Sequence, residues 1–321
     1  MSLLPKPADF VDAMLETTIV GSFTKIGYEV RSRVGDWTGD PTNLSGQTAI
    51  VTGGTSGIGR ATAEGLLALD ADVIITSRSA DRASTAADEL NAAGLSGQAS
   101  GLALDTSSFD SVSEFARNAT SIAGSIDMVA HNAGALTAEY QTDDRGMELT
   151  LSSHLVGPYL LTKLLLPKLG VGARVIYMSS GGMYTQGLDV ARIELRAKSY
   201  KGAVAYARAK RGQVELVTHL GPTMAPGVIM HAMHPGWVAT PGVDAGLPGF
   251  GKVMGPLLRS ADQGADTMVW LAATGAPGEA PGQFWLDRET RRTAYLPGTG
   301  TTPAERERLV DWLDDQVKSH V

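Results

Sequence analysis

Cysteine is absent from this chain of 321 residues. Disulfides, cysteine-ligated metals and a thiol nucleophile are therefore excluded. Long apolar runs are absent as well, and none reaches the roughly 18 residues that a membrane span needs. The first ten residues, MSLLPKPADF, hold two prolines and an aspartate where a signal peptide would have its apolar segment. These absences predict a cytoplasmic protein.

Excess positive charge is missing too. The formal net charge is −7, whereas nucleic-acid-binding domains usually present a basic face. We therefore expect no nucleic-acid partner. The six histidines form no metal-ligand motif, so no metal site is expected. A content of 43% hydrophobic and 19% charged residues is ordinary for a globular chain with a sizeable core.

Short apolar runs alternate with helical segments over residues 47–290. The seven candidate strands are 48–52, 73–77, 101–104, 127–131, 174–179, 227–233 and 283–286. Their apolar residues are continuous rather than alternating, which is typical of strands buried on both faces. Helical segments fill the gaps between them. The pattern predicts an α/β fold, a Rossmann-type doubly wound parallel sheet of about seven strands.

The chain divides into three parts. Residues 1–46 are predicted to form an N-terminal helical extension, residues 47–290 a single domain built on the sheet, and residues 291–321 a tail with a helix. In the extension the apolar residues at helical spacing are Phe10, Met14, Leu15, Ile19 and Phe23. Three interpretations of the extension stay open: a helix packed on the core, a lid or homo-oligomer contact, and a membrane-surface anchor.

The C-terminal helix has a clear start signal. Thr302-Pro303-Ala304-Glu305 reads as a capping box with proline at the first helical position. Leu309, Trp312 and Leu313 then share one face of the helix, which we expect to pack on the domain.

A glycine-rich turn follows the first strand. TGGTSGIGR (52–60) leads from that strand into a helix, with Gly53, Gly57 and Gly59 in the turn. Such glycines permit a tight turn and close backbone approach to a pyrophosphate, which then lies at the positive end of the helix. An ordinary strand-to-helix turn is the alternative, but the position at the start of a βαβ unit favours a dinucleotide site.

The end of the second strand indicates which dinucleotide binds. NAD sites usually place an Asp or Glu there to bond the ribose 2′-hydroxyl. This chain has Ser77 and Arg78 instead, with no carboxylate before Asp81. A guanidinium can make a forked, charge-assisted bond to a 2′-phosphate. NADP(H) is therefore the predicted cofactor, and a solvated arginine near the helix start is the alternative interpretation of Arg78.

Two tyrosine–lysine pairs occur at four-residue spacing, Tyr159/Lys163 and Tyr206/Lys210. Random placement of 8 tyrosines and 9 lysines gives roughly 0.2 such pairs, so spacing cannot choose between them. Position can. Tyr206 begins the helix after a strand that ends at Ser180, and open α/β sheets bind ligands at the carboxyl ends of their strands. Tyr159 lies within an apolar helix, which favours packing, with its lysine reaching solvent.

Six motifs occur in a family's order: TGGTSGIG (52–59), LDTSS (104–108), HNAG (131–134), SS (179–180), YARAK (206–210) and HPGWVAT (234–240). Over roughly residues 47–290 the sequence thereby resembles the short-chain dehydrogenase/reductase superfamily. The 26-residue spacing from Ser180 to Tyr206 resembles its retinol-dehydrogenase-like branch.

The resemblance implies roles for matching residues. Thr52, Gly53, Thr55, Ser56, Gly57, Ile58 and Gly59 would form the phosphate loop, and Asp105 would bond the adenine amine. Asn132, Ala133 and Gly134 would line the ribose floor. Pro235, Gly236, Val238 and Thr240 would hold the nicotinamide end. Ser180, Tyr206 and Lys210 would carry out the chemistry, with Tyr206 and Lys210 also contacting the cofactor.

The chemistry of these three residues fits hydride transfer. Hydride addition to a carbonyl leaves an alkoxide that needs a proton, and a free tyrosine titrates near pH 10. A nearby lysine ammonium, with the positive nicotinamide, would lower the pKa of Tyr206 and make it a better donor at neutral pH. Ser180 would donate to the oxygen on which charge develops.

One position departs from the family pattern. The family's asparagine, which helps hold a water beside the lysine, is replaced by His154 in HLVGPY (154–159). Histidine could bond the same water and exchange its proton. A buried, neutral histidine bonded to backbone is the alternative interpretation.

The predicted substrate wall is apolar. It comprises Ala135, Leu136, Gly182, Met183, Tyr184 and the segment 241–258, and it lacks a basic cluster. We therefore expect an apolar alcohol, ketone or aldehyde as substrate of an NADP(H)-dependent dehydrogenase or reductase. The alternative is a non-catalytic, NADP(H)-sensing or partner-binding protein on the same fold.

Overall fold

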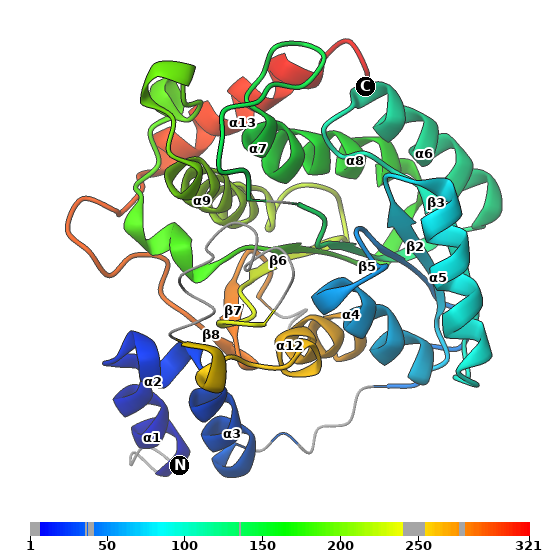
Figure 1. Cartoon of the computed structure of the whole chain (residues 1–321), viewed down its shortest axis with the longest axis horizontal. Helices are drawn as coiled ribbons and strands as arrows, with labels where there is room; N and C mark the ends of the chain where they lie inside the picture. Colours follow the sequence, from blue (N-terminus) through cyan, green and yellow to red (C-terminus); the bar gives the residue numbers. More distant parts are fainter. Residues whose placement is uncertain (1–6, 36, 38–41, 135, 240–253, 276–279) are drawn as a thin grey trace.

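An eight-stranded sheet forms the centre of the protein, with helices on both faces (Figure 1). The computed structural model describes residues 7–35, 37, 42–134, 136–239, 254–275 and 280–321. The strands are β1 (Thr48–Val51), β2 (Asp72–Ser77), β3 (Ala99–Ala103), β4 (Ile126–His131), β5 (Leu169–Met178), β6 (Ile229–Met233), β7 (Phe284–Leu286) and β8 (Glu289–Thr290). Their order is β3-β2-β1-β4-β5-β6-β7-β8, and β1 to β7 are parallel.

The predicted doubly wound parallel sheet is confirmed, and each of the seven predicted strands is present. The sheet has eight strands rather than the predicted seven or so, because β8 adds an antiparallel edge strand beside β7. Its two residues are polar and exposed. The chain reverses into β8 at Asp287 and Arg288, whose φ angles are 53° and 59°. Strands are predicted from runs of apolar residues, and neither the turn nor this two-residue polar strand contains one.

Helices cover the two faces of the sheet in two groups. One group, α4 (Gly57–Ala68), α5 (Ala80–Ala92) and α12 (Ala261–Ala273), buries its apolar side chains against one face. The other, α6 (Phe109–Ile122), α8 (Gly157–Leu165) and α9 (Gly202–Leu220), covers the opposite face, as Figure 1 shows. Serine caps help to start α5 and α6, at Ser79 and Ser108. Strand order reverses between β1 and β4, so a ligand crevice is expected at their carboxyl ends.

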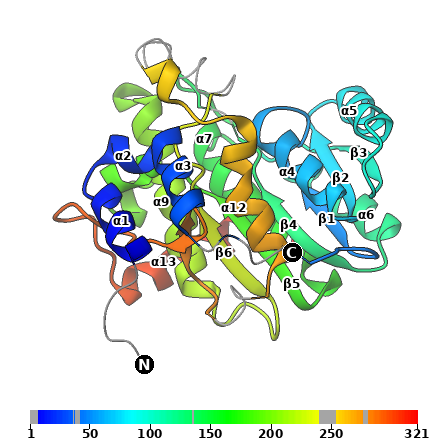
Figure 2. The same cartoon turned by 90° about the horizontal axis from the view of Figure 1, so that it is seen from below.

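The N-terminal extension forms three short helices rather than one: α1 (Pro7–Glu16), α2 (Ile19–Phe23) and α3 (Lys25–Val34). They lie beside α12, as Figure 2 shows. The apolar residues therefore do not share one buried face. Phe23 is 8% exposed, whereas Phe10 and Met14 are 65% and 59% exposed. The extension packs on the core, as the first interpretation has it, and what its outer face contacts stays a prediction.

Buried ion pairs fix the extension in place. Arg31 of α3 bonds Asp12 and Glu16 of α1, at 2.5 and 2.8 Å. It also bonds Asp287 in the turn between β7 and β8, at 2.8 Å. Asp287 in turn bonds Arg259, at 2.5 Å. Arg31, Asp287 and Arg259 are all buried, and the single Asp287 carboxylate faces both guanidiniums. Asp12 and Glu16 supply further negative charge to Arg31.

The C-terminal helix α13 (Pro303–Val317) begins with the predicted capping box. The Thr302 hydroxyl accepts from the Glu305 N–H at 3.3 Å, and the Glu305 carboxylate accepts from the Thr302 N–H at 2.8 Å. Leu309 and Leu313 are buried, and Trp312 packs against the same core. Among the helices of the described ranges, none is both long and apolar enough to cross a membrane.

Candidate active site

Ser180, Tyr206 and Lys210 come together at the carboxyl ends of the strands. Ser180 follows β5 directly and caps a short 3₁₀ helix, η3 (Gly181–Thr185), where its Oγ accepts from the Gly182 N–H at 3.2 Å. The Tyr206 hydroxyl is hydrogen-bonded to Ser180. Lys210 lies one turn further along α9, with its Nζ 5.5 Å from the centre of the Tyr206 ring.

Lys210 also joins α9 to the end of β5. Its Nζ donates to the Met178 carbonyl at 2.6 Å, and its own carbonyl accepts from the Ser179 hydroxyl at 2.9 Å. The side chain is 2% exposed. Burial lowers the pKa of Lys210 from 10.5 to about 7, because a charged ammonium is poorly solvated there.

Burial raises the pKa of Tyr206 above the ordinary value of 10, and the hydrogen bond with Ser180 opposes that rise. Burial disfavours phenolate, and it also disfavours the lysine charge that would stabilise phenolate. The lowering expected from Lys210 together with the positive nicotinamide concerns the oxidised complex and stays a prediction.

His154 lies directly against Tyr206. It belongs to a π-helical turn, η1 (Ser152–Val156), and π turns in helices are frequent at functional sites. The two rings stand perpendicular, with 5.2 Å between their centroids. Gly134 packs so tightly on the imidazole that a Cβ there would lie 1.9 Å from His154 Cε1. The Gln213 amide donates to the His154 carbonyl at 2.5 Å.

His131 is a site neighbour that the motif reading did not single out. It ends β4, and its Nε2 shares a 2.8 Å hydrogen bond with the Thr162 hydroxyl, which also bonds the Tyr177 hydroxyl at 2.8 Å. Burial and the charge of Lys210 lower the pKa of His131 to about 3. The imidazole is therefore neutral at physiological pH. A polar residue within an apolar strand needs a buried hydrogen-bond partner, so His131 in DMVAH and Tyr177 in RVIYM could have indicated such a network.

The glycine-rich turn is held by a set of short hydrogen bonds. The Thr52 hydroxyl accepts from the N–H groups of Asn132 and Ala133, both at 3.0 Å. The Asn132 amide donates to the carbonyls of Thr52 and Gly53, at 3.0 and 3.3 Å. Thr76 of β2, which the motif reading missed, accepts from the Gly53 N–H at 3.1 Å. The turn is thereby anchored to both neighbouring strands.

Glycine is required at two places in this turn. Gly53 has a φ of +66°, and a Cβ at Gly59 would lie 2.3 Å from the Gly53 carbonyl. Helix α4 begins at Gly57, after Thr55 and Ser56 and just before Ile58, so its positive end faces the turn. A glycine turn at the positive end of a helix has the charge and the open backbone that pyrophosphate binding uses.

Arg78 and Asp105 follow the neighbouring strands β2 and β3. Arg78 follows β2 and is exposed, and within the described part of the chain its guanidinium has no ion-pair partner. Asp105 follows β3, where its Oδ1 accepts from the N–H and hydroxyl of Ser107, at 2.9 and 2.6 Å. The structure thus places both side chains after neighbouring strands, as the motifs predict.

The Pro235-Gly236 turn after β6 lies at the other end of the crevice. Gly236 has a φ of +75°, and its N–H donates to His234 Nδ1 at 3.2 Å. Val238 is buried and pairs with Arg259 in a parallel bridge. Thr240, the last predicted residue of this group, lies outside the described residues.

The predicted substrate wall is described in part. Ala135 and residues 240–253 lie outside the described residues. Met183 and Tyr184, which follow Ser180 in η3, are buried in the hydrophobic core, so the prediction that they line a substrate surface is wrong. Leu136 is half-buried.

The second tyrosine–lysine pair is a packing element, as predicted. The Tyr159 hydroxyl donates to Asp314 of α13 at 2.7 Å, and Lys163 bonds the same carboxylate at 3.1 Å. Lys163 thus ends on a carboxylate rather than in free solvent, which corrects that detail. The two YxxxK pairs lie on different helices and serve different contacts.

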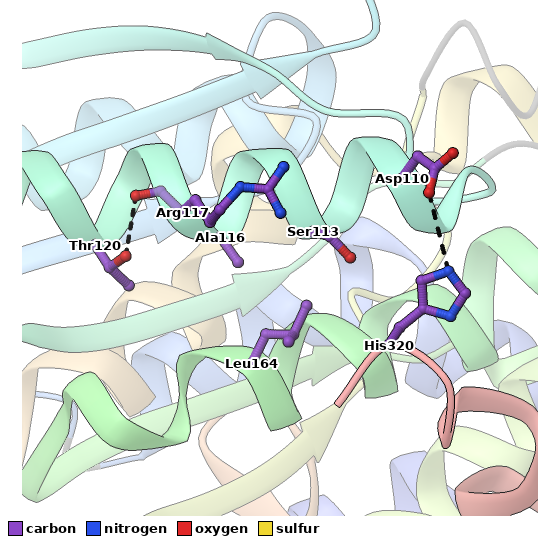
Figure 3. Close-up of a pocket in the computed structure, with 7 residues that line it drawn as sticks. All are labelled: Asp110, Ser113, Ala116, Arg117, Thr120, Leu164 and His320. Carbon is purple, nitrogen blue, oxygen red and sulfur yellow. Dashed lines mark hydrogen bonds and ion pairs between the residues drawn. The ribbon is translucent and has the colours of Figure 1, made fainter.

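A surface pocket between α6, α8 and the C-terminal end of the chain is separate from this site (Figure 3). His320 approaches Asp110 at one end of it, at 3.9 Å. None of Ser180, Tyr206 and Lys210 lines it. It therefore has no part in the chemistry described here. Across the described ranges, no cluster of three potential metal-ligating side chains is present.

Comparison with known proteins agrees with this geometry. A family model described as short chain dehydrogenase matches residues 47–246. The segments FTKIGYE, SSGGM, HPGWVATPGV and QGADTMVWLA predict a likeness to Dehydrogenase/reductase SDR family member 12. That likeness is confirmed: the Bos taurus protein is 35% identical over 303 residues, which covers 92% of this chain and 94% of the relative.

Two further similarities are more distant. Retinol dehydrogenase 13 of Homo sapiens is 27% identical over 253 residues, covering 75% of this chain and 76% of the relative. Among solved structures, the Pseudomonas aeruginosa RhlG/NADP active-site complex superposes with a TM-score of 0.62 at 22% identity. The superposition covers 75% of this chain and 94% of the RhlG chain. At this level of identity the similarity shows a shared fold.

Proposed function

This chain belongs to the short-chain dehydrogenase/reductase family, and on that premise we propose that it is an NADP(H)-dependent oxidoreductase. It transfers hydride between the nicotinamide and an apolar alcohol, ketone or aldehyde. The observation that carries the proposal is the hydrogen bond between Ser180 and Tyr206, with Lys210 buried one turn away, at the carboxyl ends of β5 and its neighbours.

The residues present fit a nicotinamide dinucleotide. The Gly53–Gly59 turn offers a cradle that side chains would fill, at the positive end of α4. Pro235, Gly236 and Val238 lie at the opposite end of the same crevice. When bound there, the cofactor supplies or accepts the hydride.

The chain's own residues manage the proton and the charge. In the reducing direction Tyr206 donates its hydroxyl proton to the substrate oxygen, and Ser180 donates a hydrogen bond to that oxygen as negative charge develops. Lys210, beside Tyr206, would hold the cofactor ribose and, in its protonated form, would favour the phenolate that remains. Lys210 is buried while Ser180 and Tyr206 are partly exposed, so the lysine contacts lie in the less solvated part of the site, where electrostatic interactions are stronger.

The preference for NADP(H) over NAD(H) rests on Arg78. Its guanidinium is exposed after β2, where an NAD site would usually place a carboxylate. A 2′-phosphate can accept two of its N–H groups. That the structurally similar RhlG is a complex with NADP is consistent with this choice.

An apolar substrate is supported by the composition of the predicted wall, which lacks a cationic cluster. The name of one relative, Retinol dehydrogenase 13, points to the same class. A non-catalytic, NADP(H)-sensing role is the second candidate, but the presence of all three residues, with Ser180 bonded to Tyr206 and Lys210 one turn away, favours catalysis.

The test is a pair of matched substitutions in the two YxxxK helices. Purified protein is assayed with NADPH against a panel of apolar carbonyls: a retinoid aldehyde, a steroid ketone and a long-chain aldehyde. Tyr206→Phe should abolish turnover while NADPH still binds. Tyr159→Phe, which removes the same atom from the packing pair, should leave turnover within about twofold of wild type. Appreciable turnover by Tyr206→Phe would remove Tyr206 from the mechanism.

A further inference from the structure

Phe23 of the N-terminal extension lies against the residue that follows Ser180. A Cβ built on Gly181 would be 2.5 Å from Phe23 Cε2 and 3.1 Å from Cδ2. The phenyl ring cannot swing away freely, because it stands edge-on to His234 at 4.5 Å and to Trp237 at 5.9 Å between centroids. Gly181 thus has no side chain because the extension occupies that space.

The main chain around Phe23 contacts the other end of the crevice. The Phe23 carbonyl accepts from the Trp237 N–H at 2.7 Å. It also approaches Gly236, where a Cβ would lie 2.7 Å from that oxygen. The extension therefore touches both the turn that carries Ser180 and the Pro235-Gly236 turn.

Arg259 holds these segments together. It donates to three consecutive carbonyls of the extension: Nη2 to Ser22 at 3.0 Å, and Nε to Phe23 and Thr24 at 3.1 and 3.2 Å. Its Nη1 donates to the Pro235 carbonyl at 3.3 Å. Asp287 accepts from both terminal nitrogens, at 2.5 and 2.8 Å. Every nitrogen of a guanidinium that is 1% exposed is thereby satisfied.

From these contacts we propose that the N-terminal extension is a structural part of the catalytic site. Phe23 is a positioning residue for the Ser180-Gly181 turn, and Arg259 is a positioning residue for the Pro235-Gly236 turn. The predicted effects on turnover rest on the proposed function. The contacts themselves can be tested without it.

The two residues act on different turns, so their substitutions should have different kinetic effects. Phe23→Ala removes the ring but keeps the carbonyl that bonds Trp237. It should lower kcat about tenfold with the NADPH dissociation constant unchanged within about twofold. Arg259→Lys keeps a charge for Asp287 but cannot reach three carbonyls at once. It should weaken NADPH binding about tenfold.

Each substitution has a matched control in the same part of the fold. Phe10→Ala makes the same truncation on the exposed face of α1, and Arg288→Lys makes the same replacement in an arginine that bonds Asp266 at 2.6 Å. Both should leave kcat and the NADPH dissociation constant within about twofold of wild type.

A double-mutant cycle between positions 23 and 181 decides the proposal. Gly181→Ala should lower kcat at least tenfold in the wild-type background, because its methyl group collides with Phe23. In the Phe23→Ala background the methyl group has room, so Gly181→Ala should cost less than about twofold. An equal effect of Gly181→Ala in both backgrounds would overturn the positioning role of Phe23.

Hydrogen exchange of the backbone amides in residues 181–185 provides a readout that needs no turnover. Exchange there should rise in Gly181→Ala relative to wild type, and exchange in the double variant should recover to the rate of Phe23→Ala alone. If that recovery is seen but no carbonyl is reduced by any variant or by wild type, the proposed oxidoreductase function fails and the positioning role stands. If turnover is present but neither readout is coupled, the positioning role fails.

Discussion

The imidazole of His154 stands perpendicular to the ring of Tyr206, with 5.2 Å between the ring centroids. The same imidazole fills the space over Gly134, so it fixes the position of two predicted site segments at once. This contact gives His154 a physical role beside Tyr206 whatever its part in proton transfer.

His154→Ala should therefore impair both stability and turnover. Removal of a buried ring leaves a cavity, and the free energy of unfolding should fall by about 2 to 3 kcal/mol. We expect kcat to fall about tenfold because Tyr206 loses the surface that holds its ring, while the NADPH dissociation constant changes less than about twofold. Urea unfolding and steady-state kinetics measure the two effects. His219→Ala, near the end of α9, serves as the control, and an equal loss of turnover in that variant would contradict a local effect.

Lys210 should make the stability of the protein depend on pH. Its pKa is 10.5 ordinarily and about 7 in the folded state. Below pH 7 it is protonated in both states, so the cost of burying its charge is fully present. Between about pH 7 and 10.5 the unfolded chain binds more protons, so stability rises with pH. Over pH 7 to 9 this gain should be about 2 kcal/mol.

The measurement is chemical unfolding at pH 7, 8 and 9 of wild type and of Lys210→Met. The variant carries no titrating group at this position. The unfolding free energy of wild type minus that of the variant should therefore rise by about 2 kcal/mol from pH 7 to pH 9. A difference that stays constant across this range would show that Lys210 does not titrate there.

Arg78→Ala should change cofactor preference without weakening NADH use. A charge-assisted bond to phosphate contributes about 1.5 to 3 kcal/mol, so KM for NADPH should rise roughly 10- to 100-fold. KM for NADH should change less than about threefold, because NADH has no 2′-phosphate. Arg82→Ala removes an exposed guanidinium one turn along α5 and should change neither value. Equal KM values for the two cofactors in wild type would contradict the assignment of Arg78.

Asp314→Ala should destabilise the protein slightly and leave its chemistry intact. The carboxylate accepts from Tyr159 and Lys163, which are on the face of α8 that α13 covers. Because Lys163 and Asp314 are partly exposed, at 28% and 48%, the ion pair contributes little. The free energy of unfolding should fall by about 1 kcal/mol, mainly from the lost tyrosine bond. A change in kcat greater than about twofold would show that the packing pair is coupled to the active site.

Local sequence patterns were sufficient for most of the fold. The continuous apolar runs TAIVT, VIITS and RVIYMS predict buried strands because no alternating pattern competes with them. The capping box formed by Thr302 and Glu305 predicts the start of α13, since the two residues that bond each other lie within four positions of the sequence. Position after β5 was enough to distinguish Tyr206 from Tyr159.

Features that depend on distant partners could not be read in this way. Lys163 meets Asp314 across 151 residues, and Arg31 meets Asp287 across 256 residues. Nothing in the local sequence of either arginine or lysine identifies such a partner. The same holds for Phe23, whose helical spacing suggested one apolar face, whereas its neighbours Phe10 and Met14 stay exposed. The direction of the Tyr206 pKa shift also depended on burial, which spacing alone does not reveal.

The ion pair between Arg31 and Asp287 also sets an order of events during synthesis. Helices α1 to α3 are made before the sheet, but the Asp287 carboxylate that bonds Arg31 is made 256 residues after that arginine. At translation rates of roughly 5 to 20 residues per second, that delay is on the order of 10 to 50 seconds. During that delay Phe23 stays uncovered until first Gly181 and then Trp237 have been made. The extension is therefore made before the part of the fold on which it packs, and it is among the last parts to reach its native place.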